Sequence, residues 1–349
     1  MKTEVMTLDA ARDVTLTAYT QPVGGKFAYI TKRPAVLILP GGGYQYCSDR
    51  EADPVAFAYL KAGYQAFILR YSVAEYSAWP TPLLDVDQAI GLMREKADDW
   101  DLYPDKICVI GFSAGGHLAA ASATMGMQRP NAAILGYAVC GADVKSCNMS
   151  APDCNEMVDG KTPPCFVFAA RDDGLVPVKN SLGFLQALAE KGIAFESHIY
   201  SYGGHGFSTA DASVQNPSKG GTDRLSDWVG DSIGWLKEVF GDYDGEGGMT
   251  EPIVHAHMDG NYEPYLSVEC TVKKLLGIPQ SRDIVAPLMT SMRVDSTMSD
   301  EEYKEAVEQL EESIGEMKFA EVLAYAGAPE SAIETINEKL GAITNPEPV

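Results

Sequence analysis

The amino-acid sequence predicts a doubly wound α/β fold with a mostly parallel sheet, followed by a small helical module. Two observations predict the α/β part. Short apolar runs alternate with helical patterns as far as residue 240, and most of these runs are continuously apolar. Continuous apolar runs are expected for strands that helices cover on both faces. A change of composition after residue 240 marks where the helical module begins.

The predicted strands alternate with predicted helices along the first part of the chain. The strands cover residues 14–19, 27–30, 36–39, 65–69, 107–110, 133–137, 165–168 and 195–200. The first two flank a turn-like Pro-Val-Gly-Gly sequence, so we expect an antiparallel hairpin at one sheet edge. Helical patterns follow at residues 54–62, 83–96, 114–125, 180–191 and 224–239. Residues 141–164 lack periodicity and are either a plain surface loop or an insertion that shapes a pocket.

The last hundred residues differ from the rest in charge and pattern. A glycine-rich, acidic linker at 241–248 divides the chain into a domain at 1–243 and a module at 244–349. Residues 246–349 hold 20 acidic and 7 basic side chains, against 29 and 20 in the preceding residues. Amphipathic patterns predict helices at 265–276, 299–317, 319–325 and 330–340. These helices are a candidate surface for a homo-oligomer.

Composition excludes several classes of function. The net charge of −22 and the isoelectric point near 4.5 disfavour nucleic acid and anionic membranes as partners, because both would be repelled. No apolar run has the roughly 20 residues of a membrane span. The first residues lack the basic start and apolar stretch of a signal peptide, so a cytoplasmic protein is expected. The seven cysteines form no C-x-x-C pair and are expected to be reduced, although Cys147 and Cys154 would be candidates for pairing after export.

The sequence Gly111-Phe-Ser113-Ala-Gly115 follows an apolar strand-like run and continues into an alanine-rich helical pattern. A strand, a tight turn and a helix in this order are typical of a nucleophile elbow, which presents the serine hydroxyl at the carboxyl end of a strand. Gly111 and Gly115 make the turn possible, because a side chain at either position would collide with the neighbouring strand or helix. Ser113 is therefore the predicted nucleophile.

A serine nucleophile needs a base and a carboxylate that orients it. His205 lies among glycines just after the last predicted strand and is the predicted base, whereas His117 sits on the elbow helix and His198 within a strand. The carboxylate is Asp173 or its neighbour Asp172. Asp173 is favoured because Gly174 lets the chain turn directly after it.

Acyl transfer also needs backbone donors for an oxyanion. The N–H of Ala114, next to the nucleophile, is one predicted donor. The others are expected in the Gly-Gly-Gly sequence after the strand at 36–39, with Gly42 the leading candidate and Gly41 beside it. Glycines allow the backbone to approach a substrate carbonyl closely.

Four motifs together resemble a known family. They are Pro-Gly-Gly-Gly-Tyr at 40–44, the elbow at 104–120, Asp-Asp-Gly-Leu-Val-Pro-Val-Lys-Asn-Ser at 172–181 and Tyr-Gly-Gly-His-Gly-Phe at 202–207. Over roughly residues 1–240 the chain resembles α/β-hydrolase esterases of the acetyl esterase and acetylxylan esterase type. The resemblance implies Ser113, Asp173 and His205 as the triad, no cofactor, and removal of O-acetyl groups from plant cell-wall oligosaccharides. Proline at position 40 replaces the histidine of the His-Gly-Gly-Gly motif that many related esterases carry.

Other functions use the same residues. A general short-chain carboxylesterase, an arylformamidase or a peptidase would need the same triad, and an inactive assembly module is a further alternative. The alternation His255-Ala-His257-Met-Asp259 would place three ligand types on one face of a strand. No further cysteine or carboxylate spacing supports a closed site, so no metal is expected. An acetylated oligosaccharide, imported into the cytoplasm, is the expected substrate.

Overall fold

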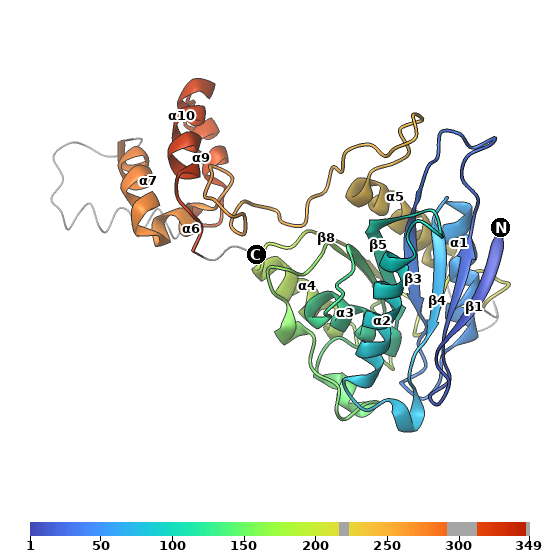
Figure 1. Ribbon diagram of the computed structural model, residues 1–349. Helices are drawn as coiled ribbons and strands as arrows, with labels where there is room; N and C mark the ends of the chain where they lie inside the picture. Colours follow the sequence, from blue (N-terminus) through green and yellow to red (C-terminus); the bar gives the residue numbers. More distant parts are fainter. Residues whose placement is uncertain (216–222, 292–312, 347–349) are drawn as a thin grey trace. The chain divides into compact units, whose positions relative to one another are not determined.

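The computed structural model describes residues 1–215, 223–291 and 313–346 (Figure 1). By their internal contacts the residues divide into two compact units, Met1–Ala256 and His257–Val349. Within the described residues, none of the helices has the length and apolar character that a membrane span requires.

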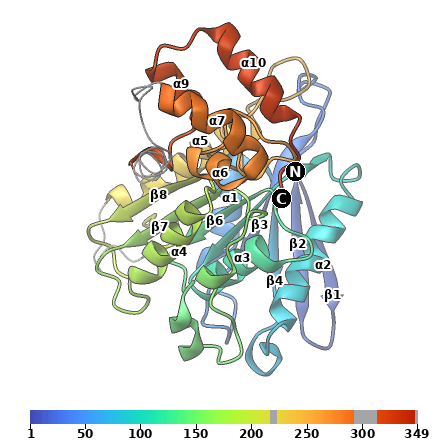
Figure 2. The same cartoon turned by 90° about the vertical axis from the view of Figure 1, so that its left-hand side faces the viewer.

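An eight-stranded sheet forms the centre of the first unit, in the order β1-β2-β4-β3-β5-β6-β7-β8 (Figure 2). The strands are β1 (Lys2–Asp9), β2 (Val14–Thr20), β3 (Arg33–Leu39), β4 (Gln65–Arg70), β5 (Leu102–Phe112), β6 (Ala132–Gly136), β7 (Cys165–Ala170) and β8 (Phe195–Tyr200). The pairs β1–β2 and β2–β4 are antiparallel, and every pair from β4 to β8 is parallel. The predicted doubly wound, mostly parallel sheet is confirmed.

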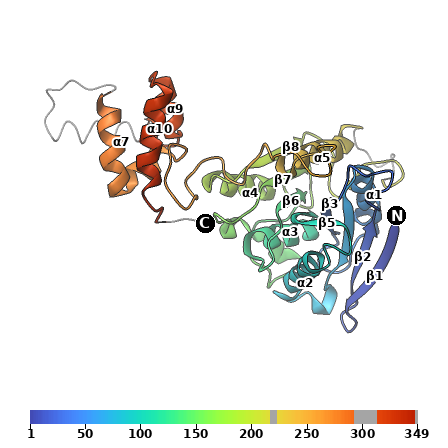
Figure 3. The same ribbon diagram turned by 45° about the horizontal axis from the view of Figure 1, so that its top comes forward.

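Helices cover both faces of this sheet (Figure 3). Odd-numbered residues of β3 such as Leu37 pack in one apolar cluster, with α2 (Thr81–Glu95), α3 (Ala114–Met125) and α4 (Lys179–Glu190). Even-numbered residues such as Ile38 pack in the other, with α1 (Asp53–Lys61) and α5 (Asp227–Phe240). Successive side chains of a strand point to opposite faces, so continuously apolar strands bury both faces at once.

The expected hairpin between residues 14–19 and 27–30 is wrong. Strand β2 instead pairs with β1, and Leu16 lies opposite Met6. Residues 27–30 form no strand; only single bridges join Phe27 to Gly24 and Ile30 to Gly247. The chain there turns repeatedly through Gly24 and Gly25, both at positive φ, which leaves too little extended backbone for a ladder.

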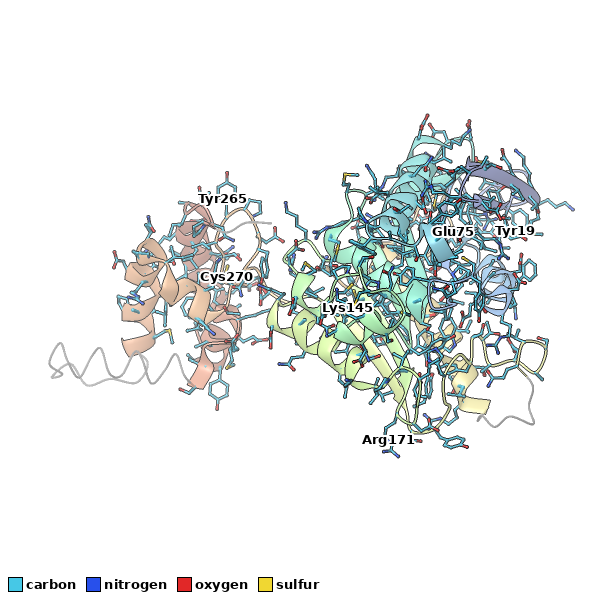
Figure 4. The ribbon with its side chains drawn as sticks, turned by 90° about the horizontal axis from the view of Figure 1, so that it is seen from below. Tyr19, Glu75, Lys145, Arg171, Tyr265 and Cys270 are labelled. Atoms are coloured by element: carbon cyan, nitrogen blue, oxygen red, sulfur yellow. The ribbon has the colours of Figure 1, made fainter. Side chains whose placement is uncertain are left out.

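Residues 141–164 form an ordered connection between β6 and β7. They contain the short 3₁₀ helices Ala142–Ser146 and Asn155–Met157, and Val144 and Cys154 are fully buried in the first cluster. Residues of this segment, which Lys145 marks in Figure 4, line the cavity described below. The interpretation as a pocket-shaping insertion therefore holds over the plain surface loop.

The boundary between the units lies after Ala256 rather than after residue 243. The N–H of Ala194 donates to the carbonyl of Ala256 at 2.9 Å, and the N–H of Val254 donates to the carbonyl of Glu238 at 3.0 Å. These bonds tie residues beyond the acidic linker to β8 and α5. The composition shift precedes the structural boundary because the linker is followed by chain that still packs on the first unit.

The second unit is helical and has an apolar core of its own, which includes Leu275, Phe319 and Leu340. Among its described residues the helices are α6 (Val272–Gly277), α7 (Pro279–Ser291), α9 (Phe319–Tyr325) and α10 (Glu330–Gly341). The last two match the predicted helices, and α7 was not predicted. Most of the predicted helix at 299–317 lies outside the described residues.

The predicted helix at 265–276 is too long. Tyr265 bridges to Thr344 in antiparallel fashion, and the helix begins only after Thr271, whose hydroxyl accepts the N–H of Lys274 at 3.3 Å. Pairing with the chain end and an N-cap at Thr271 override the helical pattern of the preceding residues. In Figure 4 Tyr265 marks the exposed part of this segment and Cys270 its buried part.

Candidate active site

Ser113 lies at the turn between β5 and α3. Its backbone has φ 53° and ψ −116°, a conformation that a serine adopts only when its surroundings enforce it. The N–H of Ser113 donates to the carbonyl of Gly136 at 2.9 Å, and its carbonyl accepts the N–H of His117 at 3.0 Å. The strained residue is thus held by its neighbours on β6 and α3, and its side chain lies in a cavity.

Glycines make this tight turn possible, as the sequence predicts. A Cβ at Gly111 would lie 2.1 Å from the carbonyl oxygen of Gly115. A Cβ at Gly115 would lie 2.2 Å from the carbonyl oxygen of Leu39. Both contacts are with backbone atoms that cannot move aside, so the elbow requires glycine at both positions.

His205 lies beside the Ser113 hydroxyl. Its Nε2 is 3.0 Å from Ser113 Oγ, and its Nδ1 is 2.7 Å from Asp173 Oδ2. A carboxylate only accepts hydrogen bonds, so Nδ1 carries the proton and Nε2 of the neutral ring accepts the hydroxyl proton of Ser113. The imidazole also packs edge-on against Tyr137, with ring centroids 5.0 Å apart.

The two adjacent aspartates have different roles. Asp173 is buried; its Oδ2 faces His205, and its Oδ1 accepts the N–H groups of Leu175 and Val176 at 2.9 and 2.8 Å. Asp172 is exposed, and its Oδ1 accepts the N–H groups of Gly203 and Gly204 at 2.8 and 3.0 Å. The bond from Gly204 is the main cause of a lowered Asp172 pKa. The structure therefore brings Asp173 to the histidine, while Asp172 anchors the loop that carries it.

The predicted oxyanion donors divide into two groups. Gly42 and Ala114 line the cavity together with Ser113, and no hydrogen bond between described residues uses their N–H groups. The prediction for Gly41 is wrong, because its N–H donates to Glu51 Oε2 at 2.8 Å. A donor already bound to a carboxylate is not free to hold an oxyanion.

The other two candidate histidines bind elsewhere. His117 is fully buried; its Nδ1 lies 2.7 Å from Tyr44 Oη and its Nε2 lies 2.9 Å from the carbonyl oxygen of Pro152. Burial lowers the pKa of His117 to about 4. The neutral ring donates from Nε2 to the carbonyl and accepts the Tyr44 hydroxyl proton at Nδ1. His198 Nε2 lies 2.8 Å from Glu196 Oε1.

The cavity around Ser113 measures about 850 Å³. The loop after β3, the loop after β6, the aspartate loop and the histidine loop all contribute to its lining. Its wall includes apolar groups such as Leu175, Val176 and Pro177, and polar ones such as Ser48, Asp143 and Lys179. Lys179 forms an ion pair with Asp143 at 3.0 Å.

The sequence interpretation missed Glu51 and Tyr137. Glu51 is only 4% exposed, and Tyr137 Oη donates to its Oε1 at 2.6 Å. The available signal for Glu51 was an acidic side chain directly before the apolar pattern of α1. Charged side chains are rarely buried without a partner.

No metal site is found in the described parts of the chain. Among these residues, no group of three or more His, Cys, Asp and Glu side chains is arranged to hold a metal ion. His257 stacks on Tyr262, and Asp259 Oδ1 accepts the N–H of Asn261 at 2.9 Å. All seven cysteines, including Cys147 and Cys154, are free thiols.

Many solved structures are similar to this chain. MGS-M1, an alpha/beta hydrolase enzyme from a Medee basin deep-sea metagenome library, is 43% identical, with a TM-score of 0.65. The alignment covers 68% of this chain and 98% of that one. This chain belongs to the α/β-hydrolase family. An acetyl ester-xyloside bifunctional hydrolase from Caldicellulosiruptor lactoaceticus is 30% identical, with a TM-score of 0.59, over 69% of this chain and 92% of that one.

Sequence comparisons agree with this assignment. The BD-FAE model matches residues 28–135, and the Dienelactone hydrolase family model matches residues 83–232. An acetylxylan esterase from Xylanibacter ruminicola is 32% identical over 196 residues, which is 50% of this chain. The first curated relatives are longer proteins, and this chain spans only 35% and 41% of their length. Both family-model matches lie within Met1–Ala256, the unit that carries the candidate site.

Proposed function

We propose that the protein is a serine esterase that removes O-acetyl groups from plant cell-wall oligosaccharides, with acetylated xylo-oligosaccharides as the main substrates. The observation that carries the proposal is the line from Ser113 Oγ through both nitrogens of His205 to Asp173, at 3.0 and 2.7 Å, on the wall of an open cavity. A nucleophile, a base and an orienting carboxylate in this order serve acyl transfer.

In the first half of the reaction, Ser113 Oγ attacks the acetyl carbonyl carbon and its proton passes to His205 Nε2. The N–H groups of Gly42 and Ala114 hold the oxyanion of the tetrahedral intermediate. His205 then donates that proton to the sugar oxygen, and the C–O bond breaks. The products are a free sugar hydroxyl and an acetyl ester on Ser113.

In the second half, water attacks the acetyl-enzyme while His205 Nε2 takes its proton. The second tetrahedral intermediate uses the same donors and collapses to acetate, with the proton returning to Ser113 Oγ. Throughout, Asp173 accepts a hydrogen bond from His205 Nδ1–H, without taking the proton, and stabilises the imidazolium that forms in each half. Its two bonds from Leu175 and Val176 fix the carboxylate in place.

The cavity mouth supports a sugar as the leaving group. Tyr46 lines the cavity and is 62% exposed, so its ring face is available to stack on a pyranose. Ser48 and the pair Asp143–Lys179 add donors and acceptors for hydroxyl groups. The names of the acetylxylan esterase and the xyloside hydrolase among the similar proteins support the same substrate class.

Acetate release from acetylated xylo-oligosaccharides and from ethyl acetate tests the substrate. Because only the sugar can stack on Tyr46, Tyr46→Ala should lower kcat/KM for the oligosaccharide about tenfold and leave ethyl acetate unchanged. Tyr29→Ala, which removes another exposed tyrosine outside the cavity lining, is the matched control. Equal losses on both substrates, or no loss on either, would contradict the stacking role.

A short-chain carboxylesterase is the second candidate. The apolar wall of Leu175, Val176 and Pro177 favours it, because such a wall accepts an alkyl or acyl chain without any sugar contact. This enzyme would cleave ethyl acetate and longer alkyl esters well and acetylated oligosaccharides poorly. Arylformamide and peptide substrates, which need the same triad, belong in the same comparison.

A further inference from the structure

Glu51 is a buried carboxylate beside the active-site cavity that the reaction above does not use. It ends a short 3₁₀ helix, Asp49–Glu51, and is 4% exposed. Its Oε2 accepts the N–H of Gly41 at 2.8 Å, and its Oε1 accepts the hydroxyl of Tyr137 at 2.6 Å. The two oxygens therefore bind donors from two different segments, 10 and 86 residues away in the chain.

The first bond fixes the glycine loop after β3. A Cβ at Gly41 would lie 2.7 Å from Glu51 Oε2 and 2.8 Å from the carbonyl oxygen of Phe112, so the loop passes closely between them. Once Gly41 is bound to the carboxylate, the next peptide group belongs to Gly42, which lines the cavity. The carboxylate thus determines where the N–H of Gly42 can lie.

The second bond reaches the histidine loop. Tyr137 Oη donates to Glu51 and accepts the N–H of Ser208 at 3.1 Å, and the Tyr137 ring packs against His205. Burial is the main cause of a raised Tyr137 pKa, which keeps this hydroxyl protonated as a donor. Glu51 therefore joins the glycine loop to the segment that follows the catalytic histidine.

We infer that Glu51 is a positioning residue, which holds the Gly42 N–H at the oxyanion and, through Tyr137, holds the histidine loop. The inference rests on the proposed acyl-transfer function. A carboxylate suits this place because it offers two acceptor oxygens to two donors. Glutamine keeps one acceptor for Gly41 but turns an N–H toward the Tyr137 hydroxyl, and alanine removes both bonds.

The test compares Glu51→Ala and Glu51→Gln with the wild type on ethyl acetate, together with inhibition by a trifluoromethyl ketone. The ketone adds to the serine hydroxyl and forms a bound oxyanion, so its affinity reports the oxyanion donors. A misplaced donor costs on the order of 10²-fold. Glu51→Ala should lower kcat and ketone affinity by this common factor, with KM changed less than about threefold. Glu51→Gln should lose about tenfold in both, because one of the two bonds is kept.

Asp87→Asn is the matched control. Asp87 is another buried carboxylate that accepts a backbone N–H, from Gln128 at 2.8 Å, and it does not line the cavity. The Asp87→Asn substitution should lower the melting temperature and leave kcat and ketone affinity unchanged. If Glu51→Ala does not fold, Glu51→Gln decides alone.

A folded Glu51 variant with wild-type kcat and ketone affinity would overturn the inference, and so would a loss confined to KM. These outcomes differ from failure of the proposed function. Turnover retained by Ser113→Ala would reject the proposed function, whereas an inactive Ser113→Ala beside fully active Glu51 variants would reject only the role of Glu51.

Discussion

The two units of the molecule differ in the kind of polar group that they bury. In the first unit the buried groups include the titratable side chains of Glu51, His117 and Asp173, each bonded to a segment far away in the sequence. In the described part of the second unit the buried polar side chains are the neutral ones of Thr271, Ser281 and Asn345. Buried titratable groups need bonded partners and can serve acid–base chemistry, whereas neutral amides and hydroxyls mainly satisfy backbone groups. We therefore expect activity to depend on the polar network of the first unit, and stability of the second unit to depend mainly on its apolar core.

The largest expected effect is a difference in kcat between substitutions of the two neighbouring aspartates, Asp172 and Asp173. Asp173→Asn should lower kcat by about 10⁴, because an amide opposite Nδ1 favours the wrong imidazole tautomer. Asp172→Asn removes the same charge one residue earlier but keeps an acceptor oxygen for Gly203 and Gly204. We expect a loss of no more than about tenfold for it. Steady-state kinetics on ethyl acetate measure both, and similar losses would show that the two carboxylates were assigned wrongly.

A substitution that creates a cavity in the core of the second unit should lower the stability of that unit and leave kcat unchanged. Phe319 is fully buried in its core, so Phe319→Ala should cost about 3–5 kcal/mol of that unit's free energy of unfolding. Hydrogen exchange of α6 and α10 measures the loss. Tyr325→Ala, at a tyrosine that is 91% exposed, is the control and should change little. The comparison would fail if Phe319→Ala lowered kcat.

The burial of His117 should make the stability of the first unit depend on pH. The unfolded chain binds a proton near pH 6.5, whereas the buried ring binds one only near pH 4. Between these values the unfolded state holds more protons, so stability falls as pH falls. Over the whole range between the two pKa values of His117, the free energy of unfolding falls by roughly 3 kcal/mol. Urea unfolding at pH 7 and pH 4.5 should show a smaller difference for His117→Gln than for the wild type. An equal difference in His117→Gln and the wild type would contradict this prediction.

Removal of the second unit should have the smallest effect on turnover. Every residue assigned to the site lies in Met1–Ala256, so the chain without residues 257–349 should cleave ethyl acetate with unchanged kcat. Light scattering of both forms tests the expected homo-oligomer. A lower number of subunits after removal would support that expectation, an unchanged number would reject it, and a large loss of kcat would contradict the division of roles.

The elbow and its partners could be predicted because their constraints are local. Gly-x-Ser-x-Gly is a steric requirement of one turn, and His205 follows a strand among glycines. The choice between Asp172 and Asp173 depended on which carboxylate faces the histidine, which only the folded loops determine. Gly41 was misassigned for the same reason, since its partner Glu51 lies on another segment.

Backbone pairing between segments far apart in the sequence explains the errors in the predicted fold. Strand β1 is an edge strand with many exposed polar residues, so its sequence lacks the apolar run of the central strands. The first half of the predicted helix at 265–276 forms a turn between single bridges instead, and Leu266 donates its N–H to the carbonyl of Ile343 near the chain end. Such contacts override local propensity, and no window of the sequence contains both partners.

In the proposed reaction Ser113 carries the acetyl group between the two halves. Rapid acid quenching of the protein with acetylated xylo-oligosaccharide, followed by mass spectrometry of the peptide that contains Ser113, detects this acetyl-enzyme. We expect an acetyl group on Ser113 in the wild type, and in Ser113→Ala both no acetylation and at least about 10⁴-fold slower acetate release. Acetate release that persists in Ser113→Ala would show that another group is the nucleophile.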